Sequence, residues 1–347
     1  FFEDHLALLG YDHEVIADFE ESATLYERLF EVNNEHEKAA GAIYTAAKFR
    51  EAMGDWEGAI TNYRAYMETY PDATEPSSKL MPLDIARLLE DNGQWNDASR
   101  EFYEFYSQRD TEGITPDQLM FARLHYAQAL FELNRDDRAL RGYRASLDWY
   151  RIQQGSGANF EIANNFAAEM MYRLSLDEFE AYMALDLSGP GRNASRQEED
   201  RVLSEQLNTK KEALAAIEIT LADIVATGAA KWSIAALVRL AECYDNMSNT
   251  FENSHIPTYL ENENQIRFYQ SGMQQFARQY LEKGLIEYNR ALEKAYEVHL
   301  YNEFTARAAQ RRSEILPLDF PTMVEQLLEP NATSAARITY DFVVDFE

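Results

Sequence analysis

Hydrophobic and small side chains recur at helical spacing along most of the chain. In the segment 40–73, Ala59, Tyr63 and Tyr66 are four and three positions apart, and most residues between them are polar. This spacing places the apolar side chains on one face of an α-helix. Similar stretches rich in Ala, Leu, Glu, Arg and Gln, with few glycines or prolines, cover most of the sequence. The pattern predicts an all-α protein.

Two helices meet at a bend within the segment 40–73. A Gly-Asp-Trp sequence at 54–56 interrupts the pattern, and Pro71 ends it. Glycine favours the left-handed conformation that ends a helix, and proline cannot donate the next helical hydrogen bond. We therefore expect a hairpin in which Ala47 of the first helix faces Ala59 of the second, because small side chains allow close approach.

The hairpin pattern recurs twice further along the chain, after 39 residues and after another 41. Longer connecting segments at 71–82 and 110–116 account for these steps, since insertions in loops leave stacked helices undisturbed. The positions that carry the pattern are Ile85, Ala86, Gly93, Trp95, Ala98, Phe102 and Phe105 in the second copy, and Ala127, Leu130, Asn134, Ala139, Leu140 and Tyr143 in the third. Asn134 stands where glycine is usual, and asparagine tolerates the left-handed conformation.

The residues from Ala40 to Ala73 resemble a tetratricopeptide repeat over nearly their whole length. The small residues, the bend and the closing proline match the family, and Tyr66 in place of the consensus alanine is the clear departure. The resemblance implies a right-handed α-solenoid of antiparallel helix hairpins whose first helices line the concave side. We therefore expect a tetratricopeptide-type array over residues 1–155.

The array is expected to begin part-way through a repeat. Gly10 and Tyr11 match the bend, and Val15, Phe19 and Ser22 match the second helix. This register leaves almost no first helix before the bend. It predicts a truncated first repeat, and a chain that is a fragment or the ordered part of a longer array.

The repeat pattern loosens between residues 156 and 316. The helices expected there are 162–174, 177–185, 198–226, 231–251 and 262–315, the last interrupted near Val298. These helices are longer than the family norm, so we expect repeat-like long hairpins as a second unit. Residues 317–347 form a proline-containing tail, in which an alternating run at 337–344 is compatible with a short strand or a docking segment.

Composition excludes several classes of partner. Apolar residues make up 46% of the 347 residues, enough to bury a core, while 60 acidic against 32 basic residues give a formal net charge of -28. Such a surface repels phosphate, so nucleic acid and anionic membranes are not expected partners. The acidity indicates either a saline habitat or a basic partner. No stretch approaches the ~18 apolar residues of a membrane helix, so membrane association is expected only through a lost leader or a partner.

No catalytic or metal-binding motif stands out. The six histidines are not paired at metal-ligand spacing, and glycine-rich phosphate loops are absent. We therefore expect no enzymatic activity, no cofactor and no metal. Two alternatives stay open: a glycan-binding helical lipoprotein, which would show an exposed row of aromatic side chains, and an α/α helical hydrolase using paired carboxylates about 5–10 Å apart.

The repeat register predicts which side chains line the concave groove. They are Tyr44, Lys48, Glu51, Leu83, Arg87, Glu90, Asp91, Leu124, Gln128 and Phe131. Chaperone cofactors of this family clamp a terminal carboxylate with lysine and asparagine at set groove positions. Those positions hold Tyr44, Asp84, Phe121 and His125 here. A carboxylate-clamp ligand is therefore not expected.

The segment 54–73, GDWEGAITNYRAYMETYPDA, is similar to bacterial cell-envelope tetratricopeptide proteins such as outer-membrane assembly lipoproteins and the periplasmic scaffolds of gliding-motility machines. This resemblance implies a protein–protein interaction scaffold within a hetero-oligomeric envelope complex. The expected location is the periplasm or cell envelope, with the cytoplasm as the alternative. The chain begins at Phe1 instead of methionine, which is compatible with a lost signal peptide or lipoprotein leader.

Overall fold

The described part of the chain is built from helices joined by short loops. The computed structural model describes residues 1–108, 112–158, 160, 162–191 and 194–321. No strand occurs among these residues, apart from one isolated bridge between Thr74 and Ser77. The prediction of an all-α protein is confirmed. The alternating run at 337–344 lies outside the described residues.

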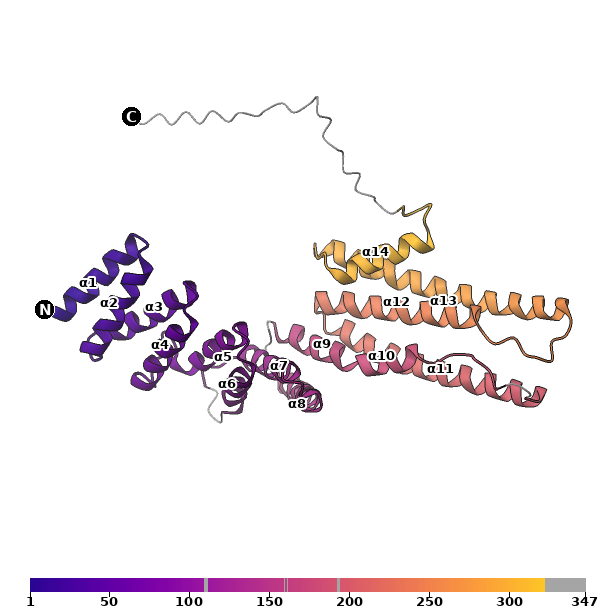
Figure 1. Cartoon of the computed structure of the whole chain (residues 1–347), viewed down its shortest axis with the longest axis horizontal. Coiled ribbons are helices and arrows are strands. Elements are labelled where there is room, and N and C mark those ends of the chain that lie inside the picture. Colours follow the sequence, from indigo (N-terminus) through magenta and orange to yellow (C-terminus); the bar gives the residue numbers. More distant parts are fainter. Residues whose placement is uncertain (109–111, 159, 161, 192–193, 322–347) are drawn as a thin grey trace, which may run out of the picture.

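Short helices form the N-terminal half and pack as successive antiparallel hairpins (Figure 1). They are α1 (Phe2–Val15), α2 (Phe19–Val32), α3 (Ala39–Ala52), α4 (Trp56–Thr69), α5 (Met81–Asp91), α6 (Trp95–Ser107), α7 (Pro116–Glu132) and α8 (Asp136–Gly155), with a short 3-10 helix, η1 (Ser78–Leu80), before α5. Each hairpin packs against the next, which gives the stacked arrangement of a helical solenoid.

The same small residues recur around each bend of the array. The bends hold left-handed residues, namely Ala17, Gly54, Gly93 and Asn134. Seven positions before them lie Gly10, Ala47, Ala86 and Ala127, and five positions after them lie Ser22, Ala59, Ala98 and Ala139, all of them buried. Small side chains are thus buried in both helices of every hairpin, where they permit close packing. This confirms the predicted packing of Ala47, Ala59, Ala86 and Ala98.

The first hairpin corrects the predicted register. Gly10 lies inside α1, and the bend falls at Ala17, whose φ is 61°. α1 has 14 residues, as many as α3. The prediction of a nearly absent first helix is therefore wrong. Gly10 is the glycine of this segment, but it holds the place in α1 that Ala47 holds in α3, and Ala17 forms the bend.

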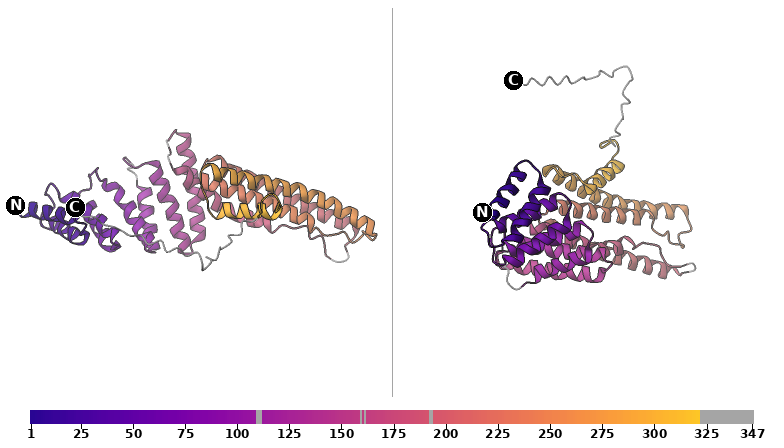
Figure 2. Two further views of the ribbon diagram at one scale, coloured as in Figure 1. Left: turned by 90° about the horizontal axis from the view of Figure 1, so that it is seen from above. Right: turned by 60° about the vertical axis from the view of Figure 1, so that its left-hand side comes forward.

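The C-terminal half lies at the other end of the molecule from α1 (Figure 2). Its helices are α9 (Ala163–Leu174), α10 (Leu176–Met183), α11 (Arg196–Ala226), α12 (Ala230–Glu252), α13 (Glu263–Glu297) and α14 (Glu303–Ile315), and α11, α12 and α13 are the longest of the described helices. The predicted helices coincide with these to within a few residues. Residues 234–238 are all buried, and a helix that is covered on every side is central to its unit. Five other helices, α9, α10, α11, α13 and α14, contact α12.

The two halves share α9. Ala163, Ala167 and Met170 of this helix belong to the apolar core of the array, whereas Ala168 and Tyr172 belong to the core around α12. The buried Arg239 of α12 also donates hydrogen bonds to residues at the end of α9. The array therefore continues into the long-helix half without a break in packing.

Candidate partner-binding groove

The first helices of successive hairpins, α3, α5 and α7, carry the predicted groove positions. Arg87 and Asp91 are exposed. The other predicted side chains except Leu124 are half-buried, namely Tyr44, Lys48, Glu51, Leu83, Glu90, Gln128 and Phe131. These helices bury one face in the core and leave the opposite face open, which is how an amphipathic helix presents side chains to a ligand.

Leu124 is the exception among the predicted groove residues. Its side chain is only 2% exposed and belongs to the core of the array. One residue along a helix turns the side-chain direction by about 100°, so the neighbouring His125 faces the open side while Leu124 faces inward. The prediction that Leu124 lines the groove is wrong.

A cavity of about 430 Å³ opens between α5 and α7. Its lining residues are Leu83, Arg87, Glu90, Asp91, Asp117, Gln118, Phe121, His125 and Ile162. The structure thus brings together four predicted groove residues, all from α5. Asp117, Gln118 and Ile162 were not predicted, because they lie at the start of α7 and in the segment before α9, outside the positions that the repeat register specifies.

The α3 end of the groove is held in a fixed arrangement. Lys48 Nζ donates to Glu51 Oε2 at 3.1 Å and lies 5.3 Å from the centroid of the Tyr63 ring. The Tyr63 hydroxyl donates to the same Glu51 oxygen at 2.8 Å. Tyr44 packs against Tyr63, with ring centroids 6.1 Å apart. A carboxylate that accepts two hydrogen bonds keeps its orientation, so this end of the groove is preorganised.

Electrostatic coupling links α3 to α5. Burial raises the pKa of the Asp84 carboxyl, Lys48 lowers it, Glu51 raises it and Arg87 lowers it, in that order of size. Charges on both helices therefore act on one half-buried group. A ligand charge placed between α3 and α5 would therefore interact with Asp84 and with the charges that already act on it.

A histidine joins α5 to α7 beside the cavity. His125 Nδ1 lies 2.7 Å from Glu90 Oε2, and the imidazole stacks on Phe121 with centroids 3.9 Å apart. Phe102 of α6 contacts the same imidazole at 5.5 Å. These contacts fix the side of the cavity formed by α7, because the ring is held both by a hydrogen bond and by aromatic packing.

The α7 end of the groove continues onto α9. Gln128 Nε2 donates to Glu169 Oε1 at 2.9 Å, and Arg173 contacts the same carboxylate. Phe131 packs on Tyr143 of α8, with centroids 5.6 Å apart. The predicted residues of α7 that remain at the surface are thus already engaged within the chain, so the open part of the groove lies at α5.

Arg87 and Asp91 are the free charges of the groove. Both are exposed, and within the described residues neither forms a hydrogen bond or an ion pair. Carboxylates outnumber cationic groups along this face, with Glu51, Asp84, Glu90, Asp91 and Asp117 against Lys48 and Arg87. The open site is therefore an acidic surface with an apolar floor made by Leu83, Phe121 and Ile162.

Paired carboxylates occur in another cavity, of about 540 Å³, between α10, α12, α13 and α14. Asp245 accepts hydrogen bonds from Arg311 at 2.6 Å and from the Tyr288 hydroxyl at 3.0 Å. Glu242 pairs with Arg307, and Glu314 pairs with Arg311. Each of these three carboxylates is thus already paired with an arginine of the same chain. This arrangement supports a structural ion-pair network.

The described residues contain no group of three or more His, Cys, Asp or Glu side chains placed to hold a metal ion. None of the described helices combines the length and the apolarity needed to cross a membrane.

Comparison with known proteins does not identify a family for this chain. No protein-family model matches the chain, and no curated protein matches it. One solved structure with overall similarity is described as a circular tandem repeat protein with novel repeat topology and enhanced subunit contact surfaces. It is 12% identical, with a TM-score of 0.23, and the match covers 90% of this chain and 62% of that one. These values are too low to carry an argument, and the resemblance to tetratricopeptide envelope proteins stays a prediction from sequence.

Proposed function

We propose that the protein is a non-enzymatic scaffold that binds another protein subunit in the groove over α3, α5 and α7. The observation that carries this proposal is the cavity between α5 and α7, whose walls are fixed by contacts within the chain while Arg87 and Asp91 stay free. A preorganised surface with free charges loses little entropy on binding. Helical repeat proteins use such surfaces to hold a partner segment.

The partner segment is expected to be basic with at least one apolar side chain. Excess carboxylates along the groove favour lysine or arginine on the partner, and charge complementarity raises the rate and specificity of association. Leu83, Phe121 and Ile162 offer an apolar side chain a place to bury surface. An acidic segment would meet Glu90 and Asp91 and be repelled.

The complex is proposed to belong to a bacterial cell envelope, with the protein as a structural subunit in the periplasm. Support comes from the similarity of the segment 54–73 to envelope scaffolds of the tetratricopeptide family. Fractionation of the source cells, followed by immunoblotting, tests this location. Recovery of the protein in the cytoplasmic fraction would contradict the envelope assignment and leave the groove proposal standing.

Affinity capture with charge-matched variants tests the groove. The full chain and its Asp91→Lys variant are used to capture proteins from an envelope extract, and mass spectrometry quantifies each protein that is retained. Glu104→Lys on α6 is the control, because Glu104 is also exposed and the change in charge is the same. We expect Asp91→Lys to reduce partner recovery about tenfold, and Glu104→Lys to leave it unchanged.

The purified partner then permits a direct titration. The affinity of the partner for the groove should fall as the salt concentration rises, because salt screens the interaction between exposed charges. Equal affinity for the Asp91→Lys and Glu104→Lys variants would show that the partner does not use this groove.

A further inference from the structure

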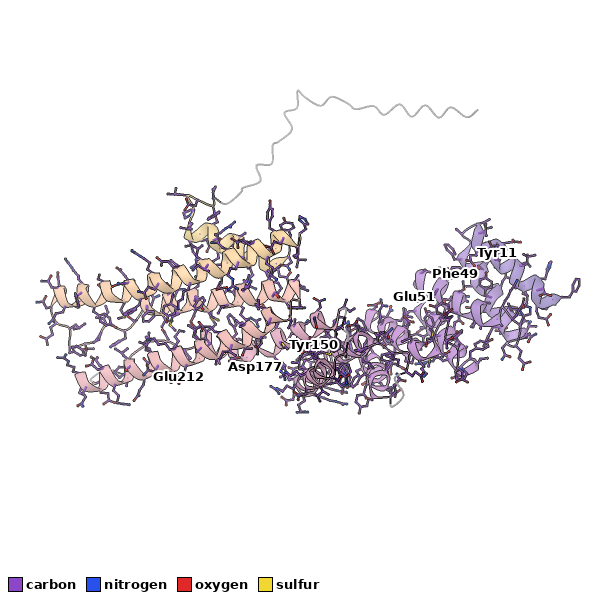
Figure 3. The ribbon with its side chains drawn as sticks, turned by 180° about the vertical axis from the view of Figure 1, so that it is seen from behind. Tyr11, Phe49, Glu51, Tyr150, Asp177 and Glu212 are labelled. Carbon is purple, nitrogen blue, oxygen red and sulfur yellow. The ribbon has the colours of Figure 1, made fainter. Side chains whose placement is uncertain are left out.

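A further cavity of the long-helix half lies between α11 and α13. α12 ends at Glu252, whereas α11 and α13 run on beyond that point (Figure 1). The cavity has a volume of about 460 Å³, within the range of small-molecule sites, ~300–1,000 Å³. Figure 3 labels Glu212 on α11, in a different part of the molecule from Glu51 of the groove. The cavity between α11 and α13 is therefore separate from the groove over α3, α5 and α7.

The walls of this cavity are mainly apolar and aromatic. They include Leu203, Leu207, Phe251, Met273, Phe276 and Tyr280. Phe251 stacks on Phe276 and on Tyr280, with centroids 5.4 and 5.7 Å apart. These stacked rings make a firm floor, and the apolar side chains of α11 and α13 face each other across the gap that α12 leaves.

The loop 253–262 closes one side and is tied to α11. Both oxygens of the Glu199 carboxylate accept the Thr258 backbone N–H, at 3.1 and 2.9 Å. The Tyr259 hydroxyl donates to Asp200 Oδ1 at 2.5 Å. Asp200 is the one acidic residue lining the cavity, and this hydrogen bond already engages it. The cavity wall therefore exists before any ligand arrives.

Two lysines line the same cavity without an anionic partner. Within the described residues, neither Lys211 nor Lys283 forms an ion pair. Lys283 Nζ lies over the rings of Tyr280 and Tyr244, 4.9 and 5.6 Å from their centroids. A ring contact leaves the ammonium free to donate hydrogen bonds. In a chain with a net charge of -28 this is a local concentration of free positive charge.

We propose that this cavity binds a small amphiphilic carboxylate, such as a medium-chain fatty acid. Its head group would be held by Lys211 and Lys283, and its apolar body would pack along Leu207, Met273 and Phe276. The apolar walls favour a body without polar groups, because a neutral sugar would leave most of its hydroxyls without partners there. The free ammonium groups favour a negative head over a neutral or positive one.

Calorimetric titration of the full chain with decanoate tests this site. The variant Lys211→Gln/Lys283→Gln removes the two cationic groups, and Lys38→Gln/Lys231→Gln is the control, because both of its lysines are exposed and the net charge changes equally. We expect one decanoate site, at least tenfold weaker in the cavity variant and unchanged in the control. Decyltrimethylammonium, which has the same alkyl chain and a positive head, should bind much more weakly.

A variant of the apolar wall tests where the alkyl chain lies. Met273→Asp should abolish decanoate binding, because it places a carboxylate against the alkyl chain, while circular dichroism confirms that the variant is folded. The proposal is overturned if decanoate does not bind, if it binds the lysine variants equally, or if maltohexaose binds in its place independently of both lysines. The groove variant Asp91→Lys should retain decanoate binding, so the two proposals can fail separately.

Discussion

Gly10 shows how a single side chain sets the distance between two helices. A Cβ atom at this position would lie 2.5 Å from a carbon of the Tyr26 ring, closer than packing allows. The Tyr26 hydroxyl is in turn bonded to Glu14 at 2.8 Å, which restricts the movement of the ring. Alanine, the next smallest side chain, occupies the equivalent positions of the following hairpins, where it is buried.

Alanine at Gly10 is expected to destabilise the array by about 1–3 kcal/mol through overpacking, partly offset by the better helix propensity of alanine. Gly41→Ala is the matched control, because a Cβ atom there meets nothing within 4 Å. That variant should gain up to about 1 kcal/mol. Urea unfolding followed by circular dichroism measures both, and equal shifts in the same direction would contradict the close packing at Gly10.

Lys210 carries a buried charge that makes stability depend on pH. Its ammonium is fully buried and donates to the Leu185 carbonyl and to Asn246 Oδ1, both at 2.5 Å. Burial lowers the pKa of this group from 10.5 to about 8, although Asp186 opposes the shift. Between these two values the unfolded chain binds more protons than the folded chain, so stability rises with pH.

Lys210 is therefore expected to contribute a rise of roughly 2 kcal/mol in the free energy of unfolding between pH 7 and 9.5, seen as the difference between the parent chain and a Lys210 variant. Burial acts in the opposite direction on other groups: it raises the pKa of the Cys243 thiol to about 12 and raises the pKa of tyrosines such as Tyr63 and Tyr143, so their ionisation in the unfolded chain lowers stability above about pH 9. Urea titrations across this range provide the measurement. Lys210→Met should remove the rise, whereas Lys211→Met at the exposed neighbour should keep it; an unchanged slope in Lys210→Met would assign the effect elsewhere.

At the scale of helices, most elements could be predicted from the sequence because each hairpin needs the same types of residue at its bend and beside it. Every copy has a residue in the left-handed conformation at the bend and small residues on both sides of it. These signals predict the positions of α3 to α8 close to those observed. α1 was missed because Ala17 adopts the left-handed conformation in place of glycine. The pattern could not reveal this, since alanine is far more common inside helices than at their ends.

The groove was only partly predictable for a related reason. Repeat register identifies which residues of a first helix face outward, and four of those expected on α5 line the cavity. It does not specify the course of the chain before α7 and α9. That course determines the positions of Asp117, in the first turn of α7, and of Ile162, just before α9. The cavity between α11 and α13 was not predicted, because helix bounds alone do not show which side chains of these two helices face each other beyond the end of α12.

The start of α7 links local stability to the groove. Thr115 Oγ1 accepts the Gln118 backbone N–H at 3.2 Å, and Gln118 Oε1 accepts the Thr115 N–H at 2.8 Å. This capping box holds the turn that carries Asp117 and Gln118 into the cavity.

Thr115→Ala is expected to lower stability by about 1 kcal/mol and to speed hydrogen exchange in the first turn of α7. Thr115→Ser keeps the oxygen and should behave like the parent chain. Mass-spectrometric exchange of peptides covering 112–122 provides the measurement. Identical exchange in the alanine and serine variants would show that the box does not hold this turn.

At the scale of the whole molecule, one shared helix joins an array of hairpins to a unit built around α12. The buried Arg239 guanidinium of α12 donates to the Tyr172 carbonyl at 2.8 Å and to Ser175 Oγ at 2.7 Å, at the end of α9. Burial lowers the pKa of this guanidinium, and its stacking on the Tyr172 ring at 3.6 Å adds a further contact. The acidic groove lies on one side of this joint and the lysine-lined cavity on the other, so the two proposed ligands would bind to different halves of the molecule.

Hydrogen exchange of the complex with the captured partner tests the scaffold proposal most directly. Peptides from α5 and from the first half of α7 should exchange more slowly in the complex than in the free chain, while peptides from α4, α6 and α8 should exchange at the same rate. Protection confined to those second helices, or to α11 and α13, would contradict binding in the groove.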